Sequence, residues 1–224
     1  MSRNSQCYLV ILAIVVATLV VASNQVLTAV PSEPLGRVQH GHRMSGHLPS
    51  AHRVRQVINS EEDVIETAVA LLARLSDYQF HQGDHKQTIL LDRSCFTLDP
   101  HQIQAYTSCS WLEWSLGRGE DAIKTLNLSV ANNPVDYEPY YALGSHYFFY
   151  TSNYCEALPW LEKAAGFPCP FPVKHTLAHC YERLGKFEQS VLIWEQRRLE
   201  EPGNGMIFNN LVRVRHKMEK AEKK

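Results

Sequence analysis

The chain has 224 residues, of which 45% are hydrophobic and 20% are charged, and its formal net charge is -1. These values exclude a collagen, a low-complexity tract and a wholly disordered chain, and the length accommodates one or two ordinary domains. The near-neutral total also gives no whole-molecule case for nucleic-acid binding. The charge is unevenly divided, since residues 1–59 hold five Arg against one Glu, residues 60–204 hold 11 basic against 20 acidic side chains, and residues 205–224 hold six basic against two acidic.

An uncharged apolar run occupies residues 8–22 (YLVILAIVVATLVVA), shortly after Arg3. Such a run cannot fold alone in water, and it serves either as the core of a secretory signal or as a membrane anchor. The length of the run and the small residues at 21–23 favour a cleaved signal peptide, whereas extension over residues 7–30 would give an uncleaved signal-anchor. We predict that residues 1–30 are a signal peptide or signal-anchor helix, and that the rest of the chain is membrane-anchored, secreted or periplasmic.

Residues 31–59 contain several Pro and Gly, four Arg and four His, with no hydrophobic period. This composition predicts a flexible basic linker. Imidazoles bind zinc, copper and nickel, so the four His also raise the alternative of a metal-handling segment. Their spacing matches no closed metal site. The four histidines are His40, His42, His47 and His52.

Three sets of residues recur every 34 positions, which indicates a repeat protein. The prolines are Pro100, Pro134, Pro168 and Pro202. The glycines are Gly83, Gly117 and Gly185, with Thr151 in the remaining slot. The small residues are Ser76, Ser110, Gly144 and Ala178. Three sets in one fixed phase predict that the same structural unit is repeated four times.

A helical hairpin explains this period. Each unit begins with an apolar-periodic segment, such as residues 101–116, that predicts a helix. A glycine then ends that helix at little steric cost, because it adopts the left-handed conformation easily. A second helix follows, for example over residues 120–131, and a proline prevents its continuation. The small residue in the middle of each first helix allows the paired helices to approach closely.

With these residues in view, residues 69–204 resemble four tandem tetratricopeptide repeats, with units near 69–102, 103–136, 137–170 and 171–204. The last unit carries the resemblance best, at Leu177, Ala178, Tyr181, Gly185, Phe187 and Pro202. In the third unit the signature falls one residue late after Tyr147, which predicts a one-residue insertion near residues 151–153. The resemblance implies an all-α fold, a right-handed superhelix of stacked helical hairpins, preceded here by an N-terminal apolar helix and a flexible linker.

Two further helical signals flank the repeats. Ser60 to Asp63 resembles a capping box, so we expect the first helix to begin near Ser60 and the repeat domain to occupy residues 60–204. Residues 205–224 place apolar side chains on one face before a basic tail. This pattern predicts a C-terminal capping helix with one face for the last repeat and one for water.

The sequence offers no catalytic motif. It contains no glycine-rich phosphate loop, no nucleophile elbow, no H-E-x-x-H and no C-x-x-C. We therefore predict that the chain is not an enzyme and holds neither cofactor nor metal. His175 and His179, four residues apart on one helix, keep a metal-handling alternative open. Their possible third partners are His146 and Cys180.

Cysteine positions favour free thiols over disulfides. Cys95 and Cys109 occupy repeat positions that usually hold apolar residues, so we expect them to be buried as thiols. Cys155 and Cys169 lie in and near the irregular third unit, where a disulfide is geometrically feasible.

The resemblance implies a concave surface lined by the first helix of each unit, and we predict that this groove binds a partner protein. Aromatic side chains there would suit an apolar anchor of a peptide or helix, although the same residues equally suit an inter-helix core. Ala73 and Asp77 stand where chaperone-binding repeats carry a carboxylate clamp, which disfavours that role. The predicted groove residues are Trp111, Trp114, Tyr141, Phe148, Phe149, His175 and His179.

These observations predict a non-enzymatic protein-protein interaction scaffold, membrane-tethered or exported, that holds a partner segment in its groove. The membrane would be contacted only through the N-terminal segment, if that segment is uncleaved. The acidic repeat region favours partners with basic residues around an apolar anchor. The alternatives are a metal-handling exported protein that uses the linker and helix histidines, and an accessory subunit of an envelope enzyme complex.

Overall fold

The computed structural model of the chain describes residues 60–223, and the regular structure in this range is entirely helical. The sequence predictions for residues 1–30 and 31–59 lie outside the described residues. Among the helices of residues 60–223, none combines the length and the apolar character that a bilayer crossing requires.

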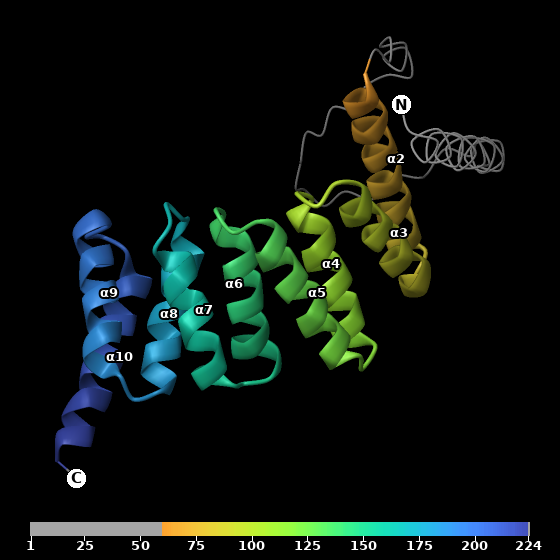
Figure 1. Cartoon of the computed structure of the whole chain (residues 1–224). Helices are drawn as coiled ribbons and strands as arrows, with labels where there is room; N and C mark the ends of the chain where they lie inside the picture. The colour runs from red at the N-terminus through yellow and green to blue at the C-terminus, as the bar shows by residue number, and fades with distance from the viewer. Residues whose placement is uncertain (1–59, 224) are drawn as a thin grey trace, which may run out of the picture. The chain divides into compact units, whose positions relative to one another are not determined.

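Helical hairpins follow one another in chain order from Ile65 to the C-terminal end of the described chain (Figure 1). The first helices of the hairpins are α2 (Glu61–His81), α4 (Ile103–Ser115), α6 (Tyr137–Ser145) and α8 (Phe171–Arg183). The second helices are α3 (His85–Leu98), α5 (Gly119–Asn132), α7 (Tyr154–Ala165) and α9 (Phe187–Glu200). From α3 onward each helix packs against the next, and α10 (Gly205–Glu222) packs against α9. The all-α fold of stacked hairpins predicted from the 34-residue period is therefore confirmed.

The predicted start of the first helix is also confirmed. The Ser60 hydroxyl oxygen accepts a hydrogen bond from the backbone N–H of Asp63 at 3.1 Å, and the Ser60 backbone N–H donates to Asp63 Oδ2 at 3.1 Å. These reciprocal bonds satisfy N–H groups that a helix start leaves without partners.

The turns inside the hairpins need a left-handed residue. Gly83, Gly117 and Gly185 adopt φ angles of 79°, 78° and 73° in three of the units. In the third unit Ser152 takes this conformation instead, with φ of 53°. One residue is added just before it by a π-helical turn, η2 (His146–Tyr150), which continues α6. A π-turn accommodates one extra residue in a helix, so the predicted insertion is present, but it lies within residues 146–150 and not at 151–153.

The small residue of each first helix lies at a close helix contact. A Cβ atom on Gly144 would lie 2.8 Å from Leu161 Cγ and 3.1 Å from the Leu161 backbone nitrogen, on the opposite helix of the same hairpin. The other small residues of the set, Ser76, Ser110 and Ala178, are buried as well. The period in small residues therefore records where the two helices of a hairpin touch.

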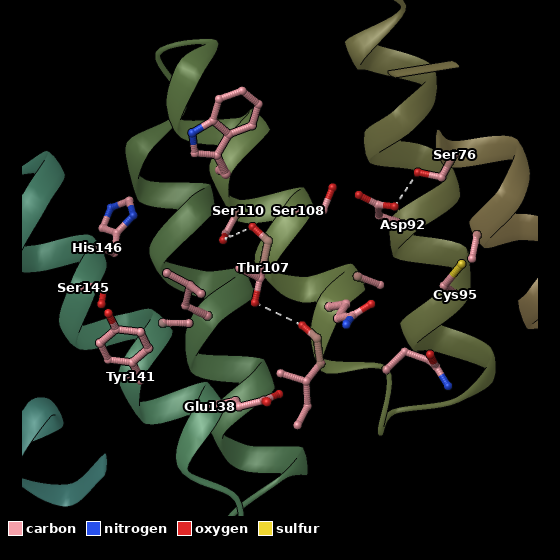
Figure 2. Close-up of a pocket in the computed structure, with 18 of the residues that line it drawn as sticks. Ser76, Asp92, Cys95, Thr107, Ser108, Ser110, Glu138, Tyr141, Ser145 and His146 are labelled. Carbon is pink, nitrogen blue, oxygen red and sulfur yellow. Dashed lines mark hydrogen bonds between the residues drawn. The ribbon is translucent and has the colours of Figure 1, made fainter. Parts of the chain in front are cut away.

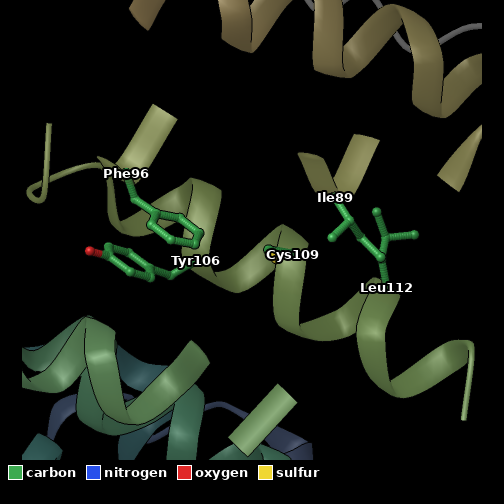
Figure 3. Packing of buried hydrophobic residues seen from close by; sticks show 5 residues of the cluster. All are labelled: Ile89, Phe96, Tyr106, Cys109 and Leu112. Carbon is green, nitrogen blue, oxygen red and sulfur yellow. The ribbon is translucent and has the colours of Figure 1, made fainter. Parts of the chain in front are cut away.

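The core is built from apolar side chains where neighbouring helices meet. Between α3 and α4, the rings of Phe96 and Tyr106 stack with centroids 4.1 Å apart, next to Cys109 and Leu112 (Figure 3). Burial of each large apolar side chain in such a cluster contributes about 1.5 to 3 kcal/mol. At the other end of the domain, Ala178 and Trp194 pack against the buried face of α10. This contact confirms the predicted capping helix.

The five cysteines within residues 60–223 are free thiols. Cys95 and Cys109 are buried as predicted, and burial raises their pKa values to about 11 and about 12. Cys155 is exposed, Cys169 is half-buried, and neither forms a disulfide within the described part of the chain.

Candidate functional site

The repeat domain contains a cavity of about 920 Å³, which we call the groove. Side chains of α2, α4, α6 and α8 line it, together with residues of α3 that reach its wall. Figure 2 shows Thr107 and Ser110 on α4 between two sets of polar groups, with Asp92 on one side and Tyr141 and His146 on the other. The groove therefore combines an open apolar surface with polar groups set into its walls.

Aromatic side chains give the groove its apolar surface. Phe80, at the end of α2, lies 6.1 Å from Trp111 on α4 between ring centroids. Both rings remain partly open to solvent, with 37% and 41% of their surface exposed. Tyr150 also lines the groove and stacks on Trp114, whose ring centroid is 4.2 Å away. Exposed aromatic rings of this kind provide large contact area at low rotamer cost.

The charged residues of the groove are all acidic. Asp77, Asp92 and Glu138 line the cavity, and none of the described residues that line it is Lys or Arg. The groove is therefore complementary in charge to a basic ligand.

Asp92 is the most unusual of these carboxylates, because only 4% of its surface is exposed. Its Oδ1 accepts a hydrogen bond of 2.5 Å from the Ser76 hydroxyl. Its Oδ2 is buried and has no hydrogen-bond partner among the described residues. Burial raises the pKa of this carboxyl, while the hydroxyl group of Ser76 and, to a smaller extent, that of Ser108 oppose the rise. An incompletely paired buried carboxylate is costly to a folded protein.

The opposite wall carries a second set of polar groups. His146, on the π-turn, is 2% exposed, and its Nε2 has no partner in the described chain. Burial lowers its pKa, so the ring is neutral at pH 7. The hydroxyl of Tyr141 lies 3.2 Å from Thr176 Oγ1, which links α6 to α8.

The predicted groove residues fall into three groups. Trp111 and Tyr141 line the groove. Phe148 and His179 line a separate cavity of about 460 Å³, which also contacts Glu182, Arg183, Arg213 and Lys217. The remaining three, Trp114, Phe149 and His175, line neither cavity.

The smaller cavity is organised around a paired carboxylate. Arg213 and Lys217, both on α10, donate to the two oxygens of Glu182 at 2.8 Å each. Burial alone would raise the pKa of Glu182, but the hydrogen bonds and charges of Arg213 and Lys217 outweigh it and lower the pKa to about 2. The arrangement fastens the capping helix to α8.

The paired histidines on α8 pack against protein groups. His175 and His179 lie 4.9 Å and 5.3 Å from the Trp194 ring, between centroids. Arg213 Nη2 is 3.3 Å from His179 Nδ1, so a fixed cation sits beside a nitrogen that a metal would need. Within residues 60–223, no three His, Cys, Asp or Glu side chains come together as a metal site. Of the possible third ligands, Cys180 is buried and bonds to the Tyr154 carbonyl.

Sequence reasoning missed several groove residues that the period could have revealed. A step of 34 residues back from Trp114 reaches Phe80. The signal for Asp92 is its contrast with its repeat equivalents, since the same position holds Leu126 in the second unit and Trp194 in the fourth. Glu138 and Tyr150 carried no sequence signal that separates them from ordinary surface residues.

Comparison with known proteins identifies the fold. No family model matches the chain, and no curated protein matches its sequence. Among solved structures, MamA is similar with a TM-score of 0.54 and 18% identity, over 70% of this chain and 88% of MamA. YrrB, a tetratricopeptide protein with an unusual peptide-binding site, is similar with a TM-score of 0.54 and 13% identity, over 69% and 84% of the two chains.

A third similar structure is PilW, a widely conserved type IV pilus biogenesis factor. Its TM-score is 0.53 at 15% identity, over 67% of this chain and 70% of PilW. At these identities the likeness concerns the fold alone. The repeat period, the stacked hairpins and these structural neighbours together show that the chain has a tetratricopeptide-type fold.

Proposed function

We propose that the chain is a non-enzymatic scaffold that holds a segment of a partner protein in the groove. The observation that carries the proposal is the pair Phe80 and Trp111, two partly exposed aromatic rings in contact at the open surface of a large cavity. The exposed part of each ring gains nothing in stability from contact with water, and aromatic side chains are enriched where proteins contact their partners.

Two further points support this function. Peptides and amphipathic helices bind in grooves by placing apolar anchors in pockets, and the cavity of about 920 Å³ is large enough for more than one side chain. YrrB, whose fold is similar, has a peptide-binding site. This support is by analogy of fold alone. The proposal also includes tethering or export of the domain through the apolar run of residues 8–22. Alkaline extraction of membranes tests the tethering, because it would release the chain if that run is not an anchor.

Site-specific cross-linking tests groove binding. A photoreactive amino acid would replace Trp111, and in a matched control it would replace Leu128, an exposed apolar residue (46%) on α5 that lines neither cavity. We expect one discrete cross-linked partner from position 111 and none from position 128. Equal products from both positions, or none from either, would contradict the proposal.

A second arm measures the contribution of the aromatic pair. In Trp111→Ala, recovery of the cross-linked partner through a probe at Tyr141 should fall about tenfold or more, because truncation of an aromatic anchor costs about 1.4 kcal/mol or more. Leu128→Ala should leave recovery unchanged. Circular dichroism must first show that both variants keep their helicity, so that lost binding is not lost folding.

A further inference from the structure

We propose that Asp92 forms a subsite in the groove for one arginine or lysine side chain of the bound partner segment. This inference rests on the proposed function and deepens it, because it names the chemistry that the groove selects. Asp92 lies on α3, outside the first helices from which the groove was predicted.

Comparison of the repeat units shows that Asp92 is a charged residue at a position where the other units have an apolar one. In the third unit, the small residue Gly144 packs on Leu161, and in the fourth unit, Ala178 packs with Trp194. In the first unit, the equivalent pair is Ser76 and Asp92, joined by a hydrogen bond of 2.5 Å. An apolar contact that the other units use for stability is here replaced by a polar pair at the wall of a cavity.

The pairing of the carboxylate is half complete. Ser76 satisfies Oδ1, whereas Oδ2 is buried without a partner among residues 60–223. Figure 2 shows Asp92 between Ser76 and Ser108, whose hydroxyl groups come from the helices on either side. A cationic side chain would supply the missing donors to Oδ2. The two hydroxyl oxygens offer acceptors for its remaining N–H groups.

The surroundings favour a positive charge. Asp77 and Glu138 also line the groove, and no Lys or Arg among its described lining residues competes for Asp92. The Trp111 and Phe80 rings line the same groove, and they suit the aliphatic stem of such a side chain and attract its cationic end. Hydrogen bonds between a cationic side chain and a carboxylate are about twice as strong as those between neutral groups.

A polypeptide fits the site better than a metal ion. A metal ion needs several protein ligands, and residues 60–223 contain no cluster of three candidate ligands. The groove extends from α2 to α8, well beyond the space around Asp92. The occupant is therefore a segment of another protein that carries Arg or Lys close to an apolar anchor.

Selection from a library of random short peptides tests the subsite. The bait is the full-length chain in a non-ionic detergent, used as wild type and as Asp92→Asn, which keeps the shape and removes the charge. We expect wild-type baits to enrich peptides with Arg or Lys beside an apolar residue, and the Asp92→Asn bait to lose the basic preference. Glu188→Gln is the matched control, because that acid on α9 is exposed and lines neither cavity.

Affinity measurements on a selected peptide make the test quantitative. Replacement of its Arg by citrulline should weaken binding to the wild-type chain about tenfold or more, and should change binding to Asp92→Asn less than about twofold. The same replacement should retain the full effect with Glu188→Gln. Peptides selected equally by wild type and Asp92→Asn would overturn the subsite but not the groove. If wild-type chain selects no peptide, the groove proposal itself fails.

Discussion

Two buried carboxylates at opposite ends of the repeat domain differ in how they are paired. Glu182 on α8 is 8% exposed and receives hydrogen bonds from Arg213 and Lys217 on both of its oxygens. Asp92 on α3 is 4% exposed and has one oxygen without a partner in the described chain. Two cationic side chains of the same chain pair with Glu182, whereas no described Lys or Arg pairs with Asp92.

This difference distinguishes a buried carboxylate that stabilises the fold from one that is available to a ligand. A carboxylate whose oxygens are all satisfied holds elements together, and the pair around Glu182 holds the capping helix to the last repeat. A carboxylate that faces a cavity with a free oxygen destabilises the fold slightly and gains when a ligand supplies the donor. The comparison predicts opposite signs for stability and for pH dependence at the two sites.

The largest expected effect on stability is at a third carboxylate, Glu113. Like Glu182, it is buried with both oxygens paired, so it should stabilise the fold. Its side chain is fully buried, Arg93 donates to Oε1 at 2.5 Å, and Thr125 donates to Oε2 at 2.8 Å. We expect Glu113→Gln to lower the free energy of unfolding by about 2 to 3 kcal/mol, since it removes the charge of a fully buried carboxylate that pairs with the half-exposed Arg93. Urea unfolding measures this loss. Glu120→Gln, at an exposed position of α5, should change stability by less than about 0.5 kcal/mol; similar losses in both variants would contradict this expectation.

Glu182 should stabilise the fold above its folded pKa and lose this contribution in acid. Its pKa is about 2 in the folded chain against a usual 4.5, so the stabilisation is complete above pH 4.5 and disappears as the pH falls towards 2. The shift corresponds to about 3 kcal/mol, which solvent around the half-exposed Arg213 and Lys217 reduces to about 2.

Unfolding of wild type and Glu182→Gln across this pH range tests the prediction. The two free energies should differ by about 2 kcal/mol at pH 6 and converge near pH 2. Glu188→Gln, an exposed acid on α9, should follow wild type throughout. A constant difference between wild type and Glu182→Gln would show that Glu182 acts through packing and not through its charge.

Arg213 should contribute less than Glu182, because Lys217 remains to pair the carboxylate. We expect Arg213→Met to cost about 1 kcal/mol and to speed hydrogen exchange at Ile207 and Leu211, the buried face of α10. Arg215→Met is the matched control, since Arg215 pairs with Glu195 on α9 and its side chain is 54% exposed. Protection that falls equally in both variants would mean that α10 responds to charge in general and not to the Glu182 contact.

Much of the fold was predictable because its signals are local and repeated. The left-handed glycines, the small residue in each first helix and the capping box at Ser60 each report one backbone constraint, and each recurs in the structure at the predicted place. The one-residue insertion was visible as a phase shift. Its π-helical form was not, because several loop conformations absorb one residue equally well.

The candidate site was less predictable because it depends on how neighbouring hairpins rotate. The period places Trp111 and Phe148 on the same helical face, yet Trp111 is open to the groove. Phe148 instead packs beside the buried side chains of α7 and α8 and lines the smaller cavity. The pairing of Glu182 joins residues 31 and 35 positions apart, and no local pattern encodes it. The prediction of the groove residues as a set stays a prediction.

The smallest change in the free energy of unfolding is expected at Asp92, and its sign should be opposite to that at Glu182. Asp92→Asn should leave the free energy of unfolding at pH 7 unchanged or raise it by up to about 1 kcal/mol, because it removes an incompletely paired charge. Burial raises the pKa of Asp92, so the folded chain binds the proton before the unfolded chain does. Wild type should therefore gain stability relative to the variant as the pH falls through that raised pKa, the reverse of Glu182.

The neighbouring Cys95 thiol, with a pKa of about 11, stays neutral in this range. Urea unfolding of both chains between pH 7 and pH 4 measures the difference, and a clear loss of stability in Asp92→Asn at pH 7 would show that Asp92 is a structural carboxylate like Glu182.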